Sequence, residues 1–355
     1  MKKGLLVWTL LLLGISLIGC SSKPKLYVLN WGDYMDESLI LDFESLYHVE
    51  IVYRESASNE DMLTLLLNSK NVYDVVIPSD YMIDKLVSLE LLLPIDFAKL
   101  DHWDSLTVIP NLNSMYEATD IMGYFVPYAW GTMGIMYQTQ IEGLKDLIET
   151  EEWAALFEYG MDYRVGMYDS PRDAVASALL YKGHSVNSIS PSELQEAEYA
   201  LIMANIDMWG EDSLKTALVQ GDLDMALVYS GDYFSEYYQA TENGEDITFD
   251  YYTPHNSNAW MDAMVIPKTS DQSDLAHQFI NFFLEYQNAL QNSSYIGYAP
   301  CFVEIYEAMV QDLEFEFALD TFNPYPDDTI RQIYQYGTDD RSEMLEAILA
   351  RAKAE

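Results

Sequence analysis

Short apolar runs alternate with amphipathic segments in the first hundred residues. Three runs have the length and composition of buried strands and lie at 26–29, 51–53 and 73–77. A segment with helical spacing of its apolar residues follows each run, near 39–46, near 60–68 and from 79. This order predicts a parallel sheet with helices on both faces. Ligands of such sheets bind beyond the carboxyl ends of the strands, where the segments 31–34 and 79–81 fall.

A second alternating block follows an extended segment at 121–138. Its strands are expected at 165–167 and 225–229, and its helices near 171–182 and 191–204. A further extended segment at 259–267 precedes helices near 274–285 and 340–353. Two α/β blocks joined by a two-segment hinge predict two lobes around a cleft that closes by hinge motion. Both lobes are predicted to be discontinuous, with lobe 1 at 25–129 plus 261–304 and lobe 2 at 130–260 plus 305–355.

The N-terminal segment is not expected to be part of this fold. Two lysines precede an apolar stretch at 5–18, which is short for a membrane span and predicts a signal peptide over 1–19. The residues Leu17-Ile18-Gly19-Cys20 resemble the lipobox of bacterial lipoproteins, in which the cysteine is lipidated. Residues 20–24 would then be a lipidated linker, and the protein would lie on the outer face of the cytoplasmic membrane or in the periplasm. An ordinary signal peptide with a chance cysteine is the alternative.

Charge and aromatic content point toward cationic partners. The chain has 18 Lys and Arg against 58 Asp and Glu, a formal net charge of −40. This field repels nucleic acid and anionic lipid and attracts cations, although an acidic surface can also serve solubility alone. The 28 tyrosines and 7 tryptophans often lie beside carboxylates. Aromatic faces pack on methylene groups and attract ammonium groups, and carboxylates neutralise those groups once water is removed.

Catalytic and metal motifs are missing from the sequence. The five histidines stand alone, without a CxxC or HExxH spacing, so no metal site and no cofactor are predicted. Cys301 has no partner if Cys20 carries lipid, and we interpret Cys301 as a small buried hydrophobe. A hydrolase with paired carboxylates leaves no sequence motif and stays open as an alternative.

Seven short segments, in the same order and with similar spacing, resemble the spermidine/putrescine-binding proteins of bacterial ABC transporters. They are 29–34, 73–81, 126–131, 169–173, 228–232, 260–262 and 296–298. The resemblance implies a type II periplasmic-binding-protein fold, with each lobe a sheet flanked by helices. It also implies a monomeric, non-enzymatic receptor that captures putrescine or spermidine and delivers it to ABC permease subunits. The same fold with a carbohydrate, amino acid or metal ligand is the alternative.

The resemblance also implies the ligand-binding residues. They are Trp31, Asp33, Tyr34, Ser79, Tyr81, Ser170, Asp173, Tyr229, Asp232, Trp260, Asp262 and Tyr298. The tryptophans and tyrosines would form walls, and the carboxylates would receive ammonium groups. These carboxylates must outweigh the positive ends of helices around the cleft, which favour anions.

Several of these positions have a purely structural alternative. Ser79 and Ser170 precede helices and are candidate N-caps, and Asp173 stands at the third helical position after Ser170. We interpret Asp80 as a helix cap rather than a ligand contact. Trp260 and Asp262 are two residues apart on an extended segment and share one face.

The sequence departs from the family at two places. Ser170 stands where a well-known spermidine-preferring member has aspartate, and Asp232 and Glu211 are candidates to restore the lost charge. Past residue 303 no segment matches the family, so any ligand contact from the C-terminal segment is unassigned.

Overall fold

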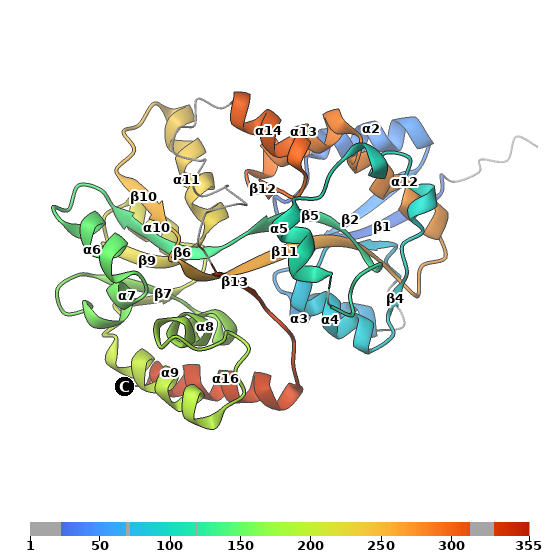
Figure 1. The fold of residues 1–355 in the computed structure, drawn as a ribbon. Helices are drawn as coiled ribbons and strands as arrows, with labels where there is room; N and C mark the ends of the chain where they lie inside the picture. The colour runs from blue at the N-terminus through green and yellow to red at the C-terminus, as the bar shows by residue number, and fades with distance from the viewer. Residues whose placement is uncertain (1–22, 69–71, 118, 313–329, 355) are drawn as a thin grey trace, which may run out of the picture.

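The computed structural model describes residues 23–68, 72–117, 119–312 and 330–354. The predicted signal peptide and Cys20 lie outside the described residues. The chain forms two α/β lobes side by side, each built on its own sheet (Figure 1). In the described ranges, no helix has the length and apolar character needed to span a bilayer.

The sheet of lobe 1 has the strand order β12-β5-β11-β3-β1-β2, with β4 and β13 attached to β11. Its parallel part is formed by β1 (Lys25–Asn30), β2 (Glu50–Glu55) and β3 (Val75–Val76), as the sequence predicts. The other strands are β4 (Leu92–Leu93), β5 (Phe125–Gly131), β11 (Asn256–Pro267), β12 (Ala299–Pro300) and β13 (Ile330–Ile333). The helices of this lobe are α2 (Glu37–Tyr47), α3 (Asn59–Leu67), α4 (Asp80–Ser88), α5 (Pro110–Tyr116), α12 (Ser273–Phe283), α13 (Tyr286–Ile296) and α14 (Val303–Asp312).

The sheet of lobe 2 has the order β10-β6-β9-β7-β8. Its strands are β6 (Met133–Gln138), β7 (Val165–Tyr168), β8 (Met208–Gly210), β9 (Met225–Tyr229) and β10 (Phe249–Tyr252). The helices around it are α6 (Leu144–Glu151), α7 (Ala154–Glu158), α8 (Pro171–Tyr181), α9 (Pro191–Met203), α10 (Ser213–Val219), α11 (Ser230–Asn243) and α16 (Asp339–Ala352). The strands β7, β8 and β9 are parallel, so their carboxyl ends meet at one edge.

Two extended crossings between the lobes lie where the sequence predicts them. One leads from β5 through Thr132 into β6, and the other is β11, whose 12 residues pair with β5, β3 and β4. A third connection exists in addition: α14 packs on α13 and β12 of lobe 1, whereas α16 packs on α8 and α9 of lobe 2. Between them β13 pairs in parallel with the first residues of β11. The predicted boundary at 304/305 assigns most of α14 to lobe 2, whereas the structure packs α14 in lobe 1.

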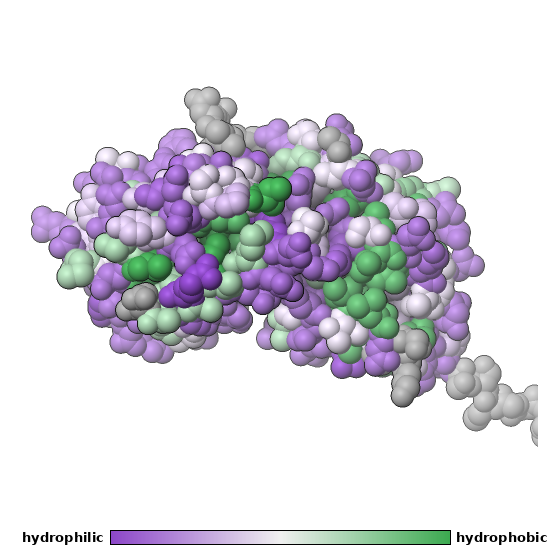
Figure 2. Space-filling view, turned by 90° about the horizontal axis from the view of Figure 1, so that it is seen from below, coloured by the Kyte–Doolittle hydropathy of each residue, from purple (hydrophilic) through white to green (hydrophobic). Residues whose placement is uncertain are grey.

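Local capping places polar residues at the edge where the lobes meet. Ser170 begins α8, and its hydroxyl accepts the backbone N–H of Asp173 at 3.4 Å. Asp232 at the start of α11 accepts the backbone N–H of Tyr229 at 3.0 Å. Both arrangements satisfy otherwise unpaired donors of a first helical turn. Seen from below, the surface is mostly hydrophilic and is notched between the two lobes (Figure 2).

Candidate functional site

Trp260 and Asp262 lie on the face of β11 that points into the junction of the lobes. Trp260 is 8% exposed and Asp262 is 6% exposed. Asp262 forms an isolated antiparallel bridge with Ser79, at the carboxyl end of β3. The carboxyl edge of the lobe 1 sheet, where ligand contacts are expected, therefore meets the long crossing strand β11 at Ser79 and Asp262.

A row of aromatic rings runs from lobe 2 to lobe 1 through Trp260. The ring centres of Tyr168 and Tyr229 are 5.2 Å apart, and Tyr229 lies 5.7 Å from Trp260. Trp260 lies 5.4 Å from Tyr298, and Tyr298 lies 5.5 Å from Tyr34. All four contacts are edge-to-face, which is a preferred geometry of aromatic pairs. We call these five residues the aromatic row.

Asp262 is a buried carboxylate with an open hydrogen-bonding position. Burial raises the pKa of Asp262 to about 6, although the Ser79 hydroxyl and the positive charge of Arg172 act in the opposite direction. Its Oδ1 has no hydrogen-bond partner among the described residues. Buried polar atoms are normally paired, because an unpaired one loses its hydration without compensation. Asp262 is therefore suited to receive a donor from a ligand.

Other buried polar atoms without a partner belong to the same region. Within the described ranges they include Trp31 Nε1, Tyr34 Oη and Trp260 Nε1. Tyr34 and Trp260 are members of the aromatic row, and Trp31 precedes Tyr34 in the turn after β1. Burial raises the pKa of the Tyr298 hydroxyl, and the charges of Asp232 and Asp262 add to the shift. Tyr298 therefore lies between carboxylates of both lobes.

Asp173 is buried, but a cation of the chain already binds it. Its exposed fraction is 1%. Arg172 donates from Nε to Oδ1 and from Nη2 to Oδ2, both at 3.1 Å, and also from Nη2 to the Tyr229 hydroxyl at 3.3 Å. The guanidinium lies 4.2 Å from the ring centre of Tyr81 and 5.0 Å from that of Tyr334. The predicted ammonium position at Asp173 is thus occupied by Arg172.

Asp232 is also paired. It is 4% exposed, and Lys215 on α10 donates to its Oδ1 at 3.1 Å. Burial raises the pKa of the Asp232 carboxyl, and the charge of Lys215 opposes that shift. Asp232 therefore does not restore a free negative charge in place of the aspartate missing at Ser170. The other candidate, Glu211, is exposed.

The polar residues at the start of α4 have structural partners. Ser79 does not cap α4 with its side chain; its hydroxyl accepts from Asn59 Nδ2 and its backbone N–H donates to Asn59 Oδ1, both at 3.0 Å. The Tyr81 hydroxyl donates to Glu60 at 3.1 Å. Asp80 accepts the Tyr81 backbone N–H at 2.7 Å and the Tyr116 hydroxyl at 2.5 Å. Ser79 is the N-cap residue of α4 and Asp80 is its first helical residue, so Asp80 makes structural hydrogen bonds without being the helix cap that the sequence suggests.

Asp33 is not brought together with Asp173 and Asp262. It is exposed and has a left-handed backbone conformation, with φ of 51°. It lines a hollow of about 260 Å³ on the surface of lobe 1, together with Tyr34, Tyr53 and Tyr295. Asp33 thus precedes Tyr34 of the aromatic row in the sequence, but it is part of the outer surface.

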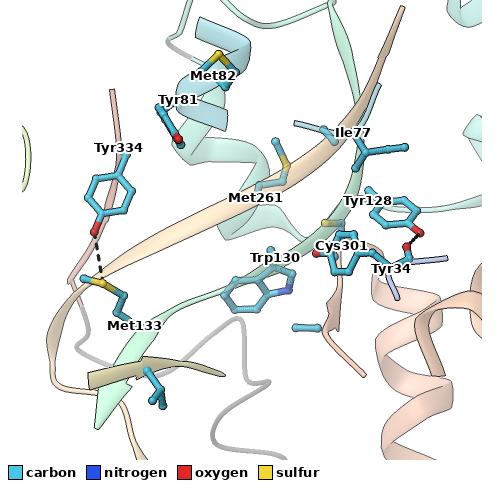
Figure 3. Close-up of a cluster of buried hydrophobic side chains, with 14 of the residues drawn as sticks. Tyr34, Ile77, Tyr81, Met82, Tyr128, Trp130, Met133, Met261, Cys301 and Tyr334 are labelled. Atoms are coloured by element: carbon cyan, nitrogen blue, oxygen red, sulfur yellow. Dashed lines mark hydrogen bonds between the residues drawn. The ribbon is translucent and has the colours of Figure 1, made fainter. Parts of the chain in front are cut away.

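Three residues of this site were missed by the sequence analysis. Tyr168 ends β7 at the carboxyl edge of the lobe 2 sheet. Its place at the end of a predicted strand is the sequence feature that could have identified it. Arg172 lies inside a segment that carries the resemblance, next to Asp173. Tyr334 follows β13 in the unmatched C-terminal segment, and its hydroxyl contacts Met133 Sδ at 3.5 Å. Figure 3 shows Tyr334 beside Tyr81 at one end of the buried cluster.

The remaining chemistry of the region is apolar or structural. In the described part of the chain, no group of three or more His, Cys, Asp and Glu residues is arranged to hold a metal ion. Cys301 is fully buried, and burial raises the pKa of its thiol well above the ordinary value. The Tyr128 hydroxyl donates to the backbone oxygen of Tyr34 and accepts from Asn292, which holds the turn after β1 in place (Figure 3).

Residues 38–315 match the family of bacterial extracellular solute-binding proteins. The chain belongs to this family. A putrescine/cadaverine-binding protein of Pseudomonas aeruginosa is 30% identical over 309 residues, which are 84% of each chain. The family and this relative are described as binding proteins rather than enzymes.

Two solved structures of binding proteins have a fold similar to that of this chain. The spermidine/putrescine ABC transporter substrate-binding protein of Streptococcus pneumoniae superimposes with a TM-score of 0.75 at 28% identity, over 93% of this chain and 99% of that one. A lipoprotein of Treponema pallidum gives a TM-score of 0.77 at 24% identity, over 93% and 100% of the two chains. The predicted two-lobed, type II periplasmic-binding-protein fold is confirmed.

Proposed function

We propose that this protein captures a small organic polycation, of the putrescine and spermidine class, between its lobes and delivers it to an ABC permease. One observation carries the proposal: Asp262 is a buried carboxylate, and neither its Oδ1 nor the indole N–H of Trp260 on the same strand face has a hydrogen-bond partner among the described residues. A desolvated carboxylate gains most from a charged donor, because a charge-assisted hydrogen bond compensates its lost hydration. A ligand ammonium group meets this requirement.

The aromatic row supplies the second half of the site. Its rings run from lobe 2 to lobe 1 and offer edges and faces to an alkyl chain that runs away from Asp262. Ring faces also attract ammonium groups. A short alkyl chain with charged ends therefore fits this environment better than a sugar, whose hydroxyl groups require many neutral partners. The names of the Pseudomonas and Streptococcus relatives support the same ligand class.

The acidic surface would assist capture. A net charge of −40 raises the local concentration of polycations and speeds their encounter with the cleft. Lipid on Cys20 would keep the receptor, as a monomer, at the outer face of the cytoplasmic membrane beside its permease, or in the periplasm. Ligand-bound, closed lobes would then be the form that docks on the permease.

A thermal-unfolding panel tests the ligand class. The folded protein is heated with putrescine, spermidine, neutral sugars and amino acids, and a specific ligand raises the midpoint by mass action. We expect the polyamines alone to raise it, and we expect the effect to shrink as sodium chloride is increased, because salt screens charge pairs. A shift with a sugar or neutral amino acid, insensitive to salt, would show that the ligand class is different.

A further inference from the structure

Asp80 is a second buried carboxylate close to the one at Asp262. It is 2% exposed and is the first residue of α4. The residue before it, Ser79, forms the isolated strand bridge with Asp262. Burial raises the pKa of Asp80 to about 7, and the charge of Asp262 adds to this shift. The ionisation of one carboxylate therefore opposes the ionisation of the other.

The hydrogen bonds of Asp80 come from neutral donors. Its Oδ1 accepts the backbone N–H of Tyr81 at 2.7 Å, and its Oδ2 accepts the hydroxyl of Tyr116 at 2.5 Å. Tyr116 lies on α5 and is 2% exposed. A buried carboxylate held only by neutral donors has lost its hydration without gaining an opposite charge, which favours its protonated form.

The buried charges at the junction of the lobes do not balance. Asp173 and Asp232 are each paired with a cation of the chain at 3.1 Å. Among the described residues, no such pair is formed by Asp80 or Asp262. When both are ionised, the two completed pairs cancel and the group keeps a formal charge of −2. A diammonium ligand carries the opposite charge.

We propose that Asp80 is a second, buried counter-charge of the ligand site, and that capture of an organic dication at Asp262 releases a proton from Asp80 to the solvent. This inference rests on the proposed function and deepens it. An ammonium group at Asp262 cancels the repulsion that keeps Asp80 protonated, and it attracts the Asp80 carboxylate as well. The O–H bond of Asp80 then ionises, and its proton passes to water. The ammonium groups of the ligand stay protonated near neutral pH, as lysine does.

The other titratable groups around the two carboxylates do not exchange protons near neutral pH. On α8, Arg172 stays charged, and its charge acts against the upward shift of the Asp80 pKa. On α3, Glu60 accepts the Tyr81 hydroxyl. Burial raises the pKa of the neighbouring hydroxyl and thiol groups above their ordinary values; they belong to Tyr81, Tyr116, Tyr334 and Cys301.

The experiment counts the protons released when putrescine binds. Titration calorimetry is performed at pH 7 in two buffers of different ionisation enthalpy, and the difference in heat gives this number. We expect the wild type to release roughly 0.3 to 0.5 of a proton, because Asp80 is about half protonated without ligand. Asp262 alone would release about 0.1 of a proton. Asp80→Asn should therefore lower the release to about this smaller value.

The affinity of Asp80→Asn provides a second readout. Linkage is reciprocal, so a ligand that lowers the pKa of Asp80 by about one unit binds the ionised form about tenfold more tightly. Asp80→Asn should therefore weaken putrescine about tenfold at pH 8. It should have little effect at pH 5.5, where Asp80 of the wild type is itself protonated. A purely structural role would weaken binding equally at both pH values.

Asp74→Asn is the matched control. Asp74 is a fully buried carboxyl of the same lobe whose pKa burial also raises, and it accepts from the Ser270 hydroxyl at 2.6 Å. It precedes β3, at the end of the strand opposite to Ser79. Its substitution should leave both the proton release and the pH dependence of the affinity as in the wild type.

Tyr116→Phe keeps Asp80 and tests the inference even if Asp80→Asn does not fold. The Tyr116 hydroxyl lowers the pKa of Asp80 through its hydrogen bond. Without that hydroxyl Asp80 holds its proton to higher pH, so Tyr116→Phe should release more protons than the wild type at pH 8.

The outcomes separate the two proposals. Equal proton release by the wild type and Asp80→Asn, an equal loss of affinity at pH 5.5 and pH 8, or unchanged release by Tyr116→Phe at pH 8 would each overturn this inference. All three results leave the proposed function intact, because putrescine still binds. If putrescine binds the wild type at none of these pH values, both proposals fail.

Discussion

Gly231 lies directly against the ring of Tyr298, so closely that a β-carbon at position 231 would come within 1.9 Å of two ring atoms. Gly231 is the second residue of α11 in lobe 2, whereas Tyr298 lies between α13 and β12 in lobe 1. Such an approach is possible only because glycine lacks a side chain. The contact joins the two lobes at the aromatic row, so it is a property of the closed arrangement.

A methyl group at position 231 should therefore obstruct closure. We expect Gly231→Ala to lower polyamine affinity at least about tenfold, because ligand binding is favoured by the closed state and that state is now strained. The midpoint of thermal unfolding without ligand should change little, since the lobes can open slightly. Titration calorimetry measures the affinity, and small-angle scattering measures whether ligand still compacts the protein.

Gly32→Ala is the matched control for this substitution. A β-carbon at Gly32 meets only the Glu55 side chain at 3.7 Å, an ordinary contact distance. Equal losses in the two variants would mean that the Gly231–Tyr298 contact has no special part in closure.

Removing the negative charge of Asp262 should abolish most of the affinity. Loss of one partner from a buried charge pair costs about 3–5 kcal/mol, so Asp262→Asn should weaken polyamine binding at least about 100-fold. Calorimetry with putrescine measures this effect. Asp33→Asn is the control, because Asp33 is exposed on the surface of lobe 1, whereas Asp262 is buried. If Asp33→Asn were the more damaging change, the anchor would have been assigned to the wrong carboxylate.

The helices and strands of the fold could be predicted from the sequence because local patterns of apolar residues determine most of them. Strands such as 26–29 and 225–229 are continuous apolar runs, and the amphipathic segments between them have helical spacing. The third connection was less visible, since β13 has only four residues and pairs with a strand more than 70 positions earlier. Pairing of that kind is decided by tertiary packing and not by local pattern.

The site could be predicted only in part. Trp260 and Asp262 alternate along an extended segment, so their common face follows from strand geometry. The pairing of Arg172 with Asp173 depends on where Tyr81 and Tyr334 bring their rings, which the sequence does not specify. Asp33 is exposed, and its backbone adopts the left-handed region, which aspartate tolerates better than most residues and which the sequence pattern does not indicate.

Binding and stability should depend on pH in opposite directions. Burial raises the pKa of Asp262 to about 6 and that of Asp80 to about 7, from an ordinary value of 3.8. For a carboxyl with a raised pKa, the folded state binds more protons than the unfolded state in this range. Stability from these groups is therefore greatest below the ordinary pKa of 3.8 and decreases as pH rises toward 6 to 7.

An ammonium ligand requires the ionised form of Asp262. We expect putrescine affinity to fall as pH is lowered below about 6, approaching about tenfold per pH unit, because protonation competes with the ligand. Calorimetry and thermal unfolding between pH 5 and 8 test both trends, and Asp262→Asn should flatten the dependence of binding. An affinity that stayed constant from pH 8 to pH 5 would exclude Asp262 as the titrating group at the ligand.

Two substitutions at Trp260 separate the contribution of its ring from that of its N–H group. Trp260→Phe keeps a ring between Tyr229 and Tyr298 but removes the Nε1 donor, which has no partner among the described residues. The loss of one hydrogen bond is worth about 1 kcal/mol, or roughly fivefold in affinity. Trp260→Ala also removes the aromatic surface and interrupts the row, so the affinity should fall by a further factor of about ten or more. If both variants bound putrescine as tightly as the wild type, the ligand would lie away from the aromatic row, and Asp262 would have to bind it without Trp260.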